Sequence, residues 1–179
     1  MKAFNSIKHS LRLFLFVLLT FTIQSCSVNP AASAMVPDEI VIVKHHPYTV
    51  SLEVRVDEGD GFLENTLIKA LDLQVAIETS INQSGLFTKV VQGNADYCLK
   101  VDADVPPVGG YIIIATVGGG WRLSNCTTKH VVMDKFIRTS DKKTFGDAFN
   151  GNTRLRLAVG GAVKKFVEEG LNQITQLDF

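Results

Sequence analysis

The sequence predicts an α+β domain in which an antiparallel sheet of about five strands carries two helices packed on one face. Three observations favour this fold class. Several segments alternate apolar and polar residues with the period of a strand, so each strand offers one face to a core and one to water. Two longer segments repeat apolar residues with the period of a helix. The connections between the later strands are too short for parallel crossovers, which indicates an antiparallel meander.

The expected elements follow one another from residue 40 onward. Residues 40–43 form an apolar run that suits a buried strand, and residues 49–56 alternate strictly. A first helix is expected over residues 63–82, and Ser84-Gly85 ends it. The remaining expected elements are strands at 86–91, 96–105, 111–123 and 130–139 and a second helix at 153–176.

Apolar positions within these elements predict the core. Gly118-Gly119-Gly120 is expected to form a bulge or bend in its strand. Gly160-Gly161 lies inside the second helix, where each glycine costs about 1 kcal/mol, so another element should approach closely there. The residues expected to be buried are Leu67, Leu71, Ile77, Val101, Ile112, Ile114 and Phe166, and the pattern leaves open which face of residues 111–117 points inward.

The first 25 residues have the features of a secretory signal peptide. Lys2, Lys8 and Arg12 make the start basic, and an apolar run follows up to Ile23. The run is too short to cross the hydrocarbon core of a bilayer as a helix. Two alternatives are an uncleaved membrane anchor and plain secretion with cleavage near residues 31–34. Both are weaker than a lipoprotein signal because neither accounts for Cys26.

The end of this segment, Ile23-Gln24-Ser25-Cys26, resembles the lipobox of bacterial lipoproteins. The resemblance implies that Cys26 carries lipid, palmitate included, and becomes the mature N-terminus. Ser27 is not the aspartate linked with inner-membrane retention, so the resemblance implies the periplasmic face of the outer membrane. The partner implied by this cysteine is therefore a membrane.

The chain then divides into three parts: a signal peptide over 1–25, a flexible tether over 26–38 and a single periplasmic domain over 39–179. Residues 1–25 carry three of the 18 basic residues and none of the 18 acidic ones, so the rest has a net charge of −3. Because the charges are spread without a basic stripe, binding to nucleic acid is not expected.

Four stretches of the domain resemble small, largely uncharacterised bacterial envelope lipoproteins: residues 76–87, 95–99, 148–154 and 158–162. The same α+β layout recurs in the TolB N-terminal domain and in YajG-like and CsgG-like lipoproteins. The resemblance implies an accessory, assembly or binding role in the cell envelope, without enzymatic activity and without a cofactor. The alternatives are a periplasmic carrier of a lipid or another apolar ligand, and a periplasmic hydrolase.

Few residues have the spacing that chemistry requires. His45 and His46 are adjacent, which places their side chains on opposite faces of a strand, and no ligand cluster follows them, so no metal site is expected. Gly118-Gly119-Gly120 lacks the lysine and the helix of a phosphate-binding loop. Cys98 and Cys126 are an even pair in an oxidising compartment, but whether they are bonded depends on geometry and stays open.

One polar surface is a candidate for binding a protein partner of the envelope. It would lie on the polar face of the sheet, where an edge strand could also accept a partner strand. The alternative is that this face is only a solvated exterior whose charges oppose edge pairing. The residues that would form it are Glu53, Arg55, Lys100, Asp102 and Asp104.

Overall fold

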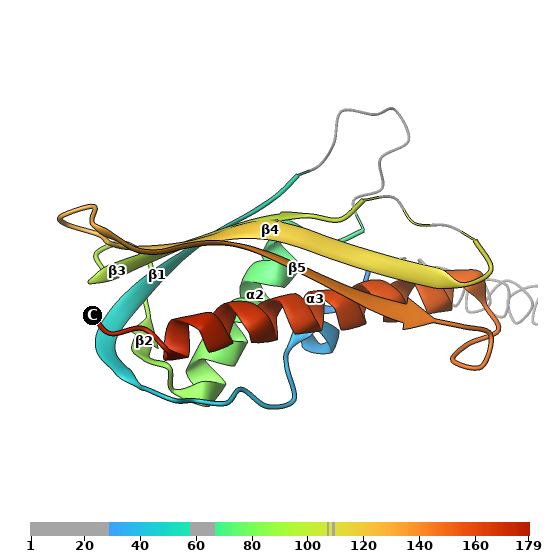
Figure 1. Ribbon diagram of the computed structural model, residues 1–179, viewed down its shortest axis with the longest axis horizontal. Helices are drawn as coiled ribbons and strands as arrows, with labels where there is room; N and C mark the ends of the chain where they lie inside the picture. Colours follow the sequence, from blue (N-terminus) through green and yellow to red (C-terminus); the bar gives the residue numbers. More distant parts are fainter. Residues whose placement is uncertain (1–28, 58–66, 107, 109) are drawn as a thin grey trace, which may run out of the picture.

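The computed structural model describes residues 29–57, 67–106, 108 and 110–179 (Figure 1). The signal peptide and Cys26 therefore lie outside the described residues. The elements are a 3₁₀ turn η1 (Ala32–Met35), strands β1 (His46–Val56), β2 (Phe87–Val90), β3 (Tyr97–Asp104), β4 (Ile113–Asn125) and β5 (Val131–Lys143), and helices α2 (Ala70–Ser84) and α3 (Gly151–Thr175).

The α+β fold is confirmed: five strands form one sheet in the order β2-β1-β3-β4-β5. The meander of β3, β4 and β5 is antiparallel, as expected. The pairings of β1 with β2 and with β3 are parallel, a feature that the sequence did not predict. Helix α2 lies in the long connection between β1 and β2, whereas the connection between β2 and β3 is short. The short connection suffices because β2 pairs with the first part of β1, from His46 to Val50, and β3 pairs with the part from Val50 to Val56.

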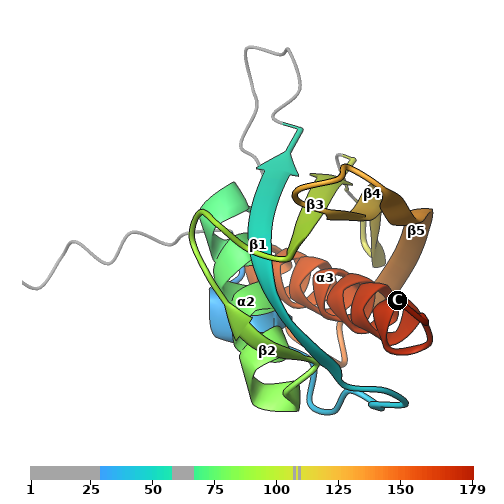
Figure 2. The ribbon, with the colours of Figure 1, turned by 90° about the vertical axis from the view of Figure 1, so that its left-hand side faces the viewer.

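Both helices pack on the same face of this sheet, as predicted (Figures 1 and 2). Helix α2 lies under β1 and β2, and α3 lies under β4 and β5. The centre of the core is formed by Trp121 of β4 and Phe166 of α3, whose rings lie 5.5 Å apart. The buried face of α2 consists of Leu73, Ala76, Ile77, Ser80 and Ile81.

The predicted phase of the first helix was wrong at Leu71. Its side chain is 68% exposed, while Leu73 is fully buried, and the helix begins at Ala70 rather than at residue 63. Residues 63–66 lie outside the described residues. The apolar residues of this segment fit two helical stripes of similar length, one that contains Leu71 and one that contains Leu73. The correct stripe places Gln74 at its border, half-buried.

Strand β4 also differs from the expectation. Ile112 and Ile114 were expected in the core but are 52% and 53% exposed, because Ile113 and its alternate neighbours face inward instead. Gly118-Gly119-Gly120 continues the ladder in regular register with β3 and β5, without the expected bulge. Gly119 is required by close packing: a Cβ there would lie 2.1 Å from the carbonyl oxygen of Asp102.

The predicted tether is shorter than residues 26–38. Residues 32–35 form η1, and Met35 is fully buried against α2 and α3. Pro30 lies against Gly160, where a Cβ would come within 3.3 Å of the proline ring, so this helical glycine does mark a close approach. Lys164 forms an ion pair with Asp38. This segment is therefore packed from Pro30 onward.

The run at residues 40–43 is not a strand. Val41 and Val43 are 66% and 69% exposed, whereas Ile40 and Ile42 are half-buried against the core. The segment continues the packed N-terminal chain and joins the sheet only at His46. An apolar run alone does not define a strand, because it needs a neighbouring strand that is free to pair with it.

Candidate functional site

The face of the sheet opposite the helices is the candidate functional surface (Figure 2). The structure brings all five of the predicted partner residues to this face. Glu53 lies opposite Lys100, and Arg55 lies opposite Asp102, in the register of β1 with β3. Asp104 follows on the same face, since side chains alternate along a strand.

These charges form local exposed pairs. A guanidinium nitrogen of Arg55 lies 2.6 Å from Oε1 of Glu53, and Nζ of Lys100 lies 3.5 Å from Oδ2 of Asp102. Exposed pairs of this kind contribute about 0–1 kcal/mol to stability. Asp104 makes no ion pair within the described ranges. The charges are therefore available to a partner without a large cost to the fold.

A hollow of about 440 Å³ lies beside these charges on the same face. Its lining combines a backbone floor from the three glycines of β4, an aromatic side chain from β5 and carboxylates from the ends of β1 and β3. The lining residues are Arg55, Val56, Asp57, Asp102, Ala103, Asp104, Gly118, Gly119, Gly120 and Phe136.

Phe136 is the residue of this hollow that the sequence analysis missed. It lies opposite Gly120 across β4 and β5, and its side chain is 74% exposed. The ring leans over Gly118, where a Cβ would come within 3.2 Å of Cζ. An aromatic side chain over cross-strand glycines covers exposed backbone, which favours this arrangement. The sequence signal was a run of glycines in one strand, but only the register shows which residue lies over them.

The shifted carboxyl groups in the described residues are held by their neighbours in structural roles. Burial raises the pKa of Asp141, but hydrogen bonds from Lys165 and Lys143 outweigh it and leave the pKa below its ordinary value. Hydrogen bonds from the backbone and side chain of Thr49 lower the pKa of Asp96. None of these groups lines the hollow. Their titration is explained by packing and turns.

The adjacent histidines separate, as their alternation predicts. Nδ1 of His45 lies 2.8 Å from the carbonyl oxygen of Gly85, on the exposed side. His46 is buried, its Nε2–H donates to the carbonyl of Ile174 at 3.0 Å, and its ring stacks on Phe179 at 4.2 Å. Among the described residues, no cluster of three or more metal-ligating side chains is found.

Burial lowers the pKa of His46, although its hydrogen bond to Ile174 acts in the opposite direction. The unfolded chain therefore binds a proton near pH 6.5 that the folded chain does not bind. We expect the contribution of neutral His46 to the free energy of unfolding to be retained above about pH 6.5 and to be lost as the pH drops below that value. Urea unfolding at a series of pH values checks this.

The variant His46→Gln should lose this pH dependence between neutral and mildly acidic pH. The variant His130→Gln is the matched control, because it makes the same substitution at an exposed histidine. Equal slopes of stability against pH for the wild-type chain and His46→Gln would contradict the assignment.

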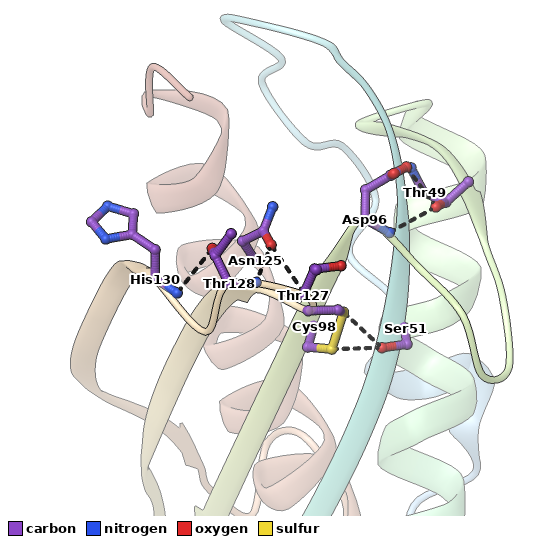
Figure 3. Close-up of a disulfide and its surroundings, with 9 residues drawn as sticks. Thr49, Ser51, Asp96, Cys98, Asn125, Thr127, Thr128 and His130 are labelled. Atoms are coloured by element: carbon purple, nitrogen blue, oxygen red, sulfur yellow. Dashed lines mark hydrogen bonds between the residues drawn. A yellow bond between two sulfur atoms is a disulfide. The ribbon is translucent and has the colours of Figure 1, made fainter.

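A disulfide joins Cys98 to Cys126, which settles the question that the sequence left open (Figure 3). It links β3 to the turn between β4 and β5, with Cα atoms 5.2 Å apart. The hydroxyl of Ser51 on β1 lies 3.4 Å from the sulfur of Cys98. Oδ1 of Asn125 accepts hydrogen bonds from the backbone amides of Thr127 and Thr128, which shapes the turn (Figure 3).

Fold and site together define a small α+β domain with one helix-covered face and one open, charged sheet face. Within the described residues, no helix is long and apolar enough to cross a membrane. Neither a family model nor a curated protein sequence matches the chain.

Solved structures with the same fold do match it. Protein XCC0632 from Xanthomonas campestris, of family DUF330, is 13% identical over 77% of this chain and 90% of its own, with a TM-score of 0.55. A minor lipoprotein from Acinetobacter baumannii is 11% identical over 72% of this chain and 94% of its own, with a TM-score of 0.50. At these identities the likeness shows the fold alone. The narrower resemblance to YajG-like and CsgG-like lipoproteins stays an expectation.

Proposed function

We propose that the protein is a lipoprotein of the outer membrane, anchored through lipid on Cys26, that acts at the periplasmic face as a non-enzymatic accessory or binding module. The observation that carries the proposal is the open sheet face, where a glycine-floored hollow adjoins exposed Phe136, Asp102 and Asp104. The Acinetobacter protein of the same fold is described as a lipoprotein, which supports the anchored location.

The hollow suits the side chain of a protein partner. Its floor is open backbone at Gly120, where a Cβ would have nothing within 4 Å, so a flat group can approach there beside the exposed ring of Phe136. Its rim carries the carboxylates of Asp102 and Asp104, which favour a cationic group such as arginine. A basic loop of an envelope protein is the partner that this chemistry fits best.

The enzyme alternative has less support. A hydrolase needs convergent polar groups with shifted pKa values in a cleft. In the described part of the chain, the shifted groups are His46, Asp96, Arg122, Asp141, Asp147 and Asp178, and none of them lines the hollow.

The carrier alternative also has less support. It needs apolar space between the sheet and the helices, yet large side chains of the described residues fill that layer. Trp121, Phe166 and Leu171 are fully buried there. The packing is so close that a Cβ on Gly170 would lie 2.3 Å from the indole of Trp121.

The lipid anchor is tested by metabolic labelling with palmitate. We expect label in the wild-type protein and none in Cys26→Ser, because no other residue of the signal region is a cysteine. The variant should also be released from the membrane fraction. Label that survives the substitution would refute lipidation at this residue.

The partner surface is tested by reversing two charges, Asp102→Lys with Asp104→Lys, followed by crosslinking in intact cells. We expect the crosslinked partner band to disappear while the melting temperature stays normal, because both side chains are exposed. The matched control is Glu39→Lys with Glu169→Lys, which makes the same charge change away from this face. Unchanged crosslinking in the first variant would leave this face as a solvated exterior.

A further inference from the structure

Exposed aromatic side chains gather at one end of the molecule, opposite the C-terminus. The end contains the start of β4 and the loop between β5 and α3 (Figure 1). Tyr111 is 81% exposed, Phe149 is 90% exposed and Phe145 is 47% exposed. The rings of Tyr111 and Phe145 lie 6.3 Å apart. These three residues are called the aromatic end below.

The loop that carries two of these rings is firmly held. Arg154 is 5% exposed, and its Nη1 donates to the carbonyl oxygens of Ala148 and Phe149 at 2.8 and 2.9 Å. Its guanidinium lies 4.0 Å from the centre of the Phe145 ring. The exposure of Phe149 is therefore set by its backbone contacts with a buried arginine. Holding the apolar ring of a phenylalanine in water is unfavourable, so its fixed exposure is consistent with contact to another surface.

Two exposed basic residues belong to the elements that carry the aromatic end. Lys142 is exposed on β5 beside Ile114, and Arg156 is exposed on the first turns of α3. The acid nearest in sequence, Asp147, accepts hydrogen bonds from the backbone and hydroxyl of Thr144 and so shapes the loop. Aromatic rings with adjacent cations are typical of protein surfaces at the headgroup level of a bilayer. Each basic residue contributes about 1 kcal/mol near an anionic lipid surface.

The N-terminal chain limits how far the domain can stand from the lipid. Pro30 packs on Gly160, which lies about 14 Å along α3 from its first residue Gly151. Four residues of chain, which span at most about 14 Å when extended, separate Cys26 from Pro30. A tether that ends at Pro30 cannot hold the domain far from the leaflet.

We infer that the aromatic end rests in the headgroup region of the phospholipid leaflet in which the lipid on Cys26 is embedded. This inference rests on the proposed lipidation. The domain is then attached to the membrane in two ways, through the lipid bonded to Cys26 and through the aromatic end. Together the two attachments orient the domain. Stable anchoring by two weak signals is the usual requirement for lipidated proteins. In this orientation the C-terminus and the turn between β4 and β5 lie at the end that points away from the leaflet (Figure 1).

Fluorescence quenching by spin-labelled lipids tests the orientation. The full lipidated chain is reconstituted into vesicles of phosphatidylethanolamine and phosphatidylglycerol that contain doxyl lipids. A polarity-sensitive fluorophore is attached at Phe149→Cys in one sample and at Gln176→Cys in the other. Gln176 is exposed at the opposite end of α3, which makes it the matched control. We expect loss of fluorescence at position 149 and no loss at position 176.

A third sample combines the label at position 149 with Tyr111→Ser and Phe145→Ser. We expect weaker quenching there, with an unchanged far-ultraviolet circular dichroism spectrum as the check on folding. Equal quenching at positions 149 and 176 in the parent samples overturns the inference.

Failure of the anchor is read separately, from the mass of the purified protein. If Cys26 carries no lipid, the labelled proteins are mixed with preformed vesicles of the same composition. Quenching at position 149 alone then still supports the aromatic end as a membrane-binding surface, and absence of quenching at that position overturns it.

Discussion

Replacing Phe166 by Ala should lower the free energy of unfolding by about 3–5 kcal/mol, the range for a fully buried phenylalanine. Phe166 has no exposed surface, and its ring packs 5.5 Å from that of Trp121. It also closes the space over Gly119, where even a Cβ would approach the Cζ atom of Phe166 to 2.9 Å. The surrounding sheet cannot collapse into the vacated volume without breaking its ladder, so most of the cavity should remain.

Leu71→Ala is the matched control for this substitution. The sequence predicts the same core role for both residues, but Leu71 is 68% exposed. Its loss should therefore change stability by less than about 0.5 kcal/mol. Urea unfolding followed by circular dichroism measures both variants. A cost above 2 kcal/mol at Leu71 would mean that α2 packs in the phase that the sequence suggested, and a small cost at Phe166 would contradict the observed core.

The strands could be predicted well where one face meets the core and the other meets water. In β3, Leu99 and Val101 are buried while Asp102 and Asp104 are exposed, as their alternation indicates. The period of two leaves no freedom in such a segment, because a slip of one residue would bury charges.

The errors have a common physical cause. At Leu71 and at Ile112 and Ile114, apolar residues occupy both of two competing faces, so the pattern does not choose between them. The choice depends on which other element packs against the segment, and the structure buries Leu73 and Ile113 in the core. The tether was misjudged for the same reason, since Met35 is buried only through the contacts of η1 with α2 and α3. Tertiary contact decides these positions, and it is not encoded locally.

The charged residues of the candidate site could be predicted from the sequence, but the hollow beside them could not. Alternation placed Glu53, Arg55 and Lys100 on one face, and their register confirms it. The hollow itself depends on Phe136 lying over the glycines of the neighbouring strand. Only the register of β4 with β5 brings these residues together. The aromatic end likewise joins Tyr111 to a loop that begins after β5.

Removing the disulfide should have the second large effect on stability. The bond joins residues 28 positions apart, and closing a loop of that length in the unfolded chain corresponds to about 3–4 kcal/mol. We expect Cys98→Ser with Cys126→Ser to lose stability by that amount in urea unfolding. The fold should persist, because the core of Trp121 and Phe166 lies between the sheet and α3, away from the two sulfur atoms.

The double variant also separates the cross-link from the contacts around it. Wild-type protein unfolded in the presence of reductant should approach the stability of the double variant, whereas the variant itself should not respond to reductant. Because the bond acts on the unfolded chain, the turn that Asn125 shapes should keep its hydrogen bonds to Thr127 and Thr128 in the folded variant. Amide exchange at these two residues measures this. A variant as stable as the oxidised wild type would show that the native strands already supply the constraint, and faster exchange at the turn would show that the bond acts by holding the folded state.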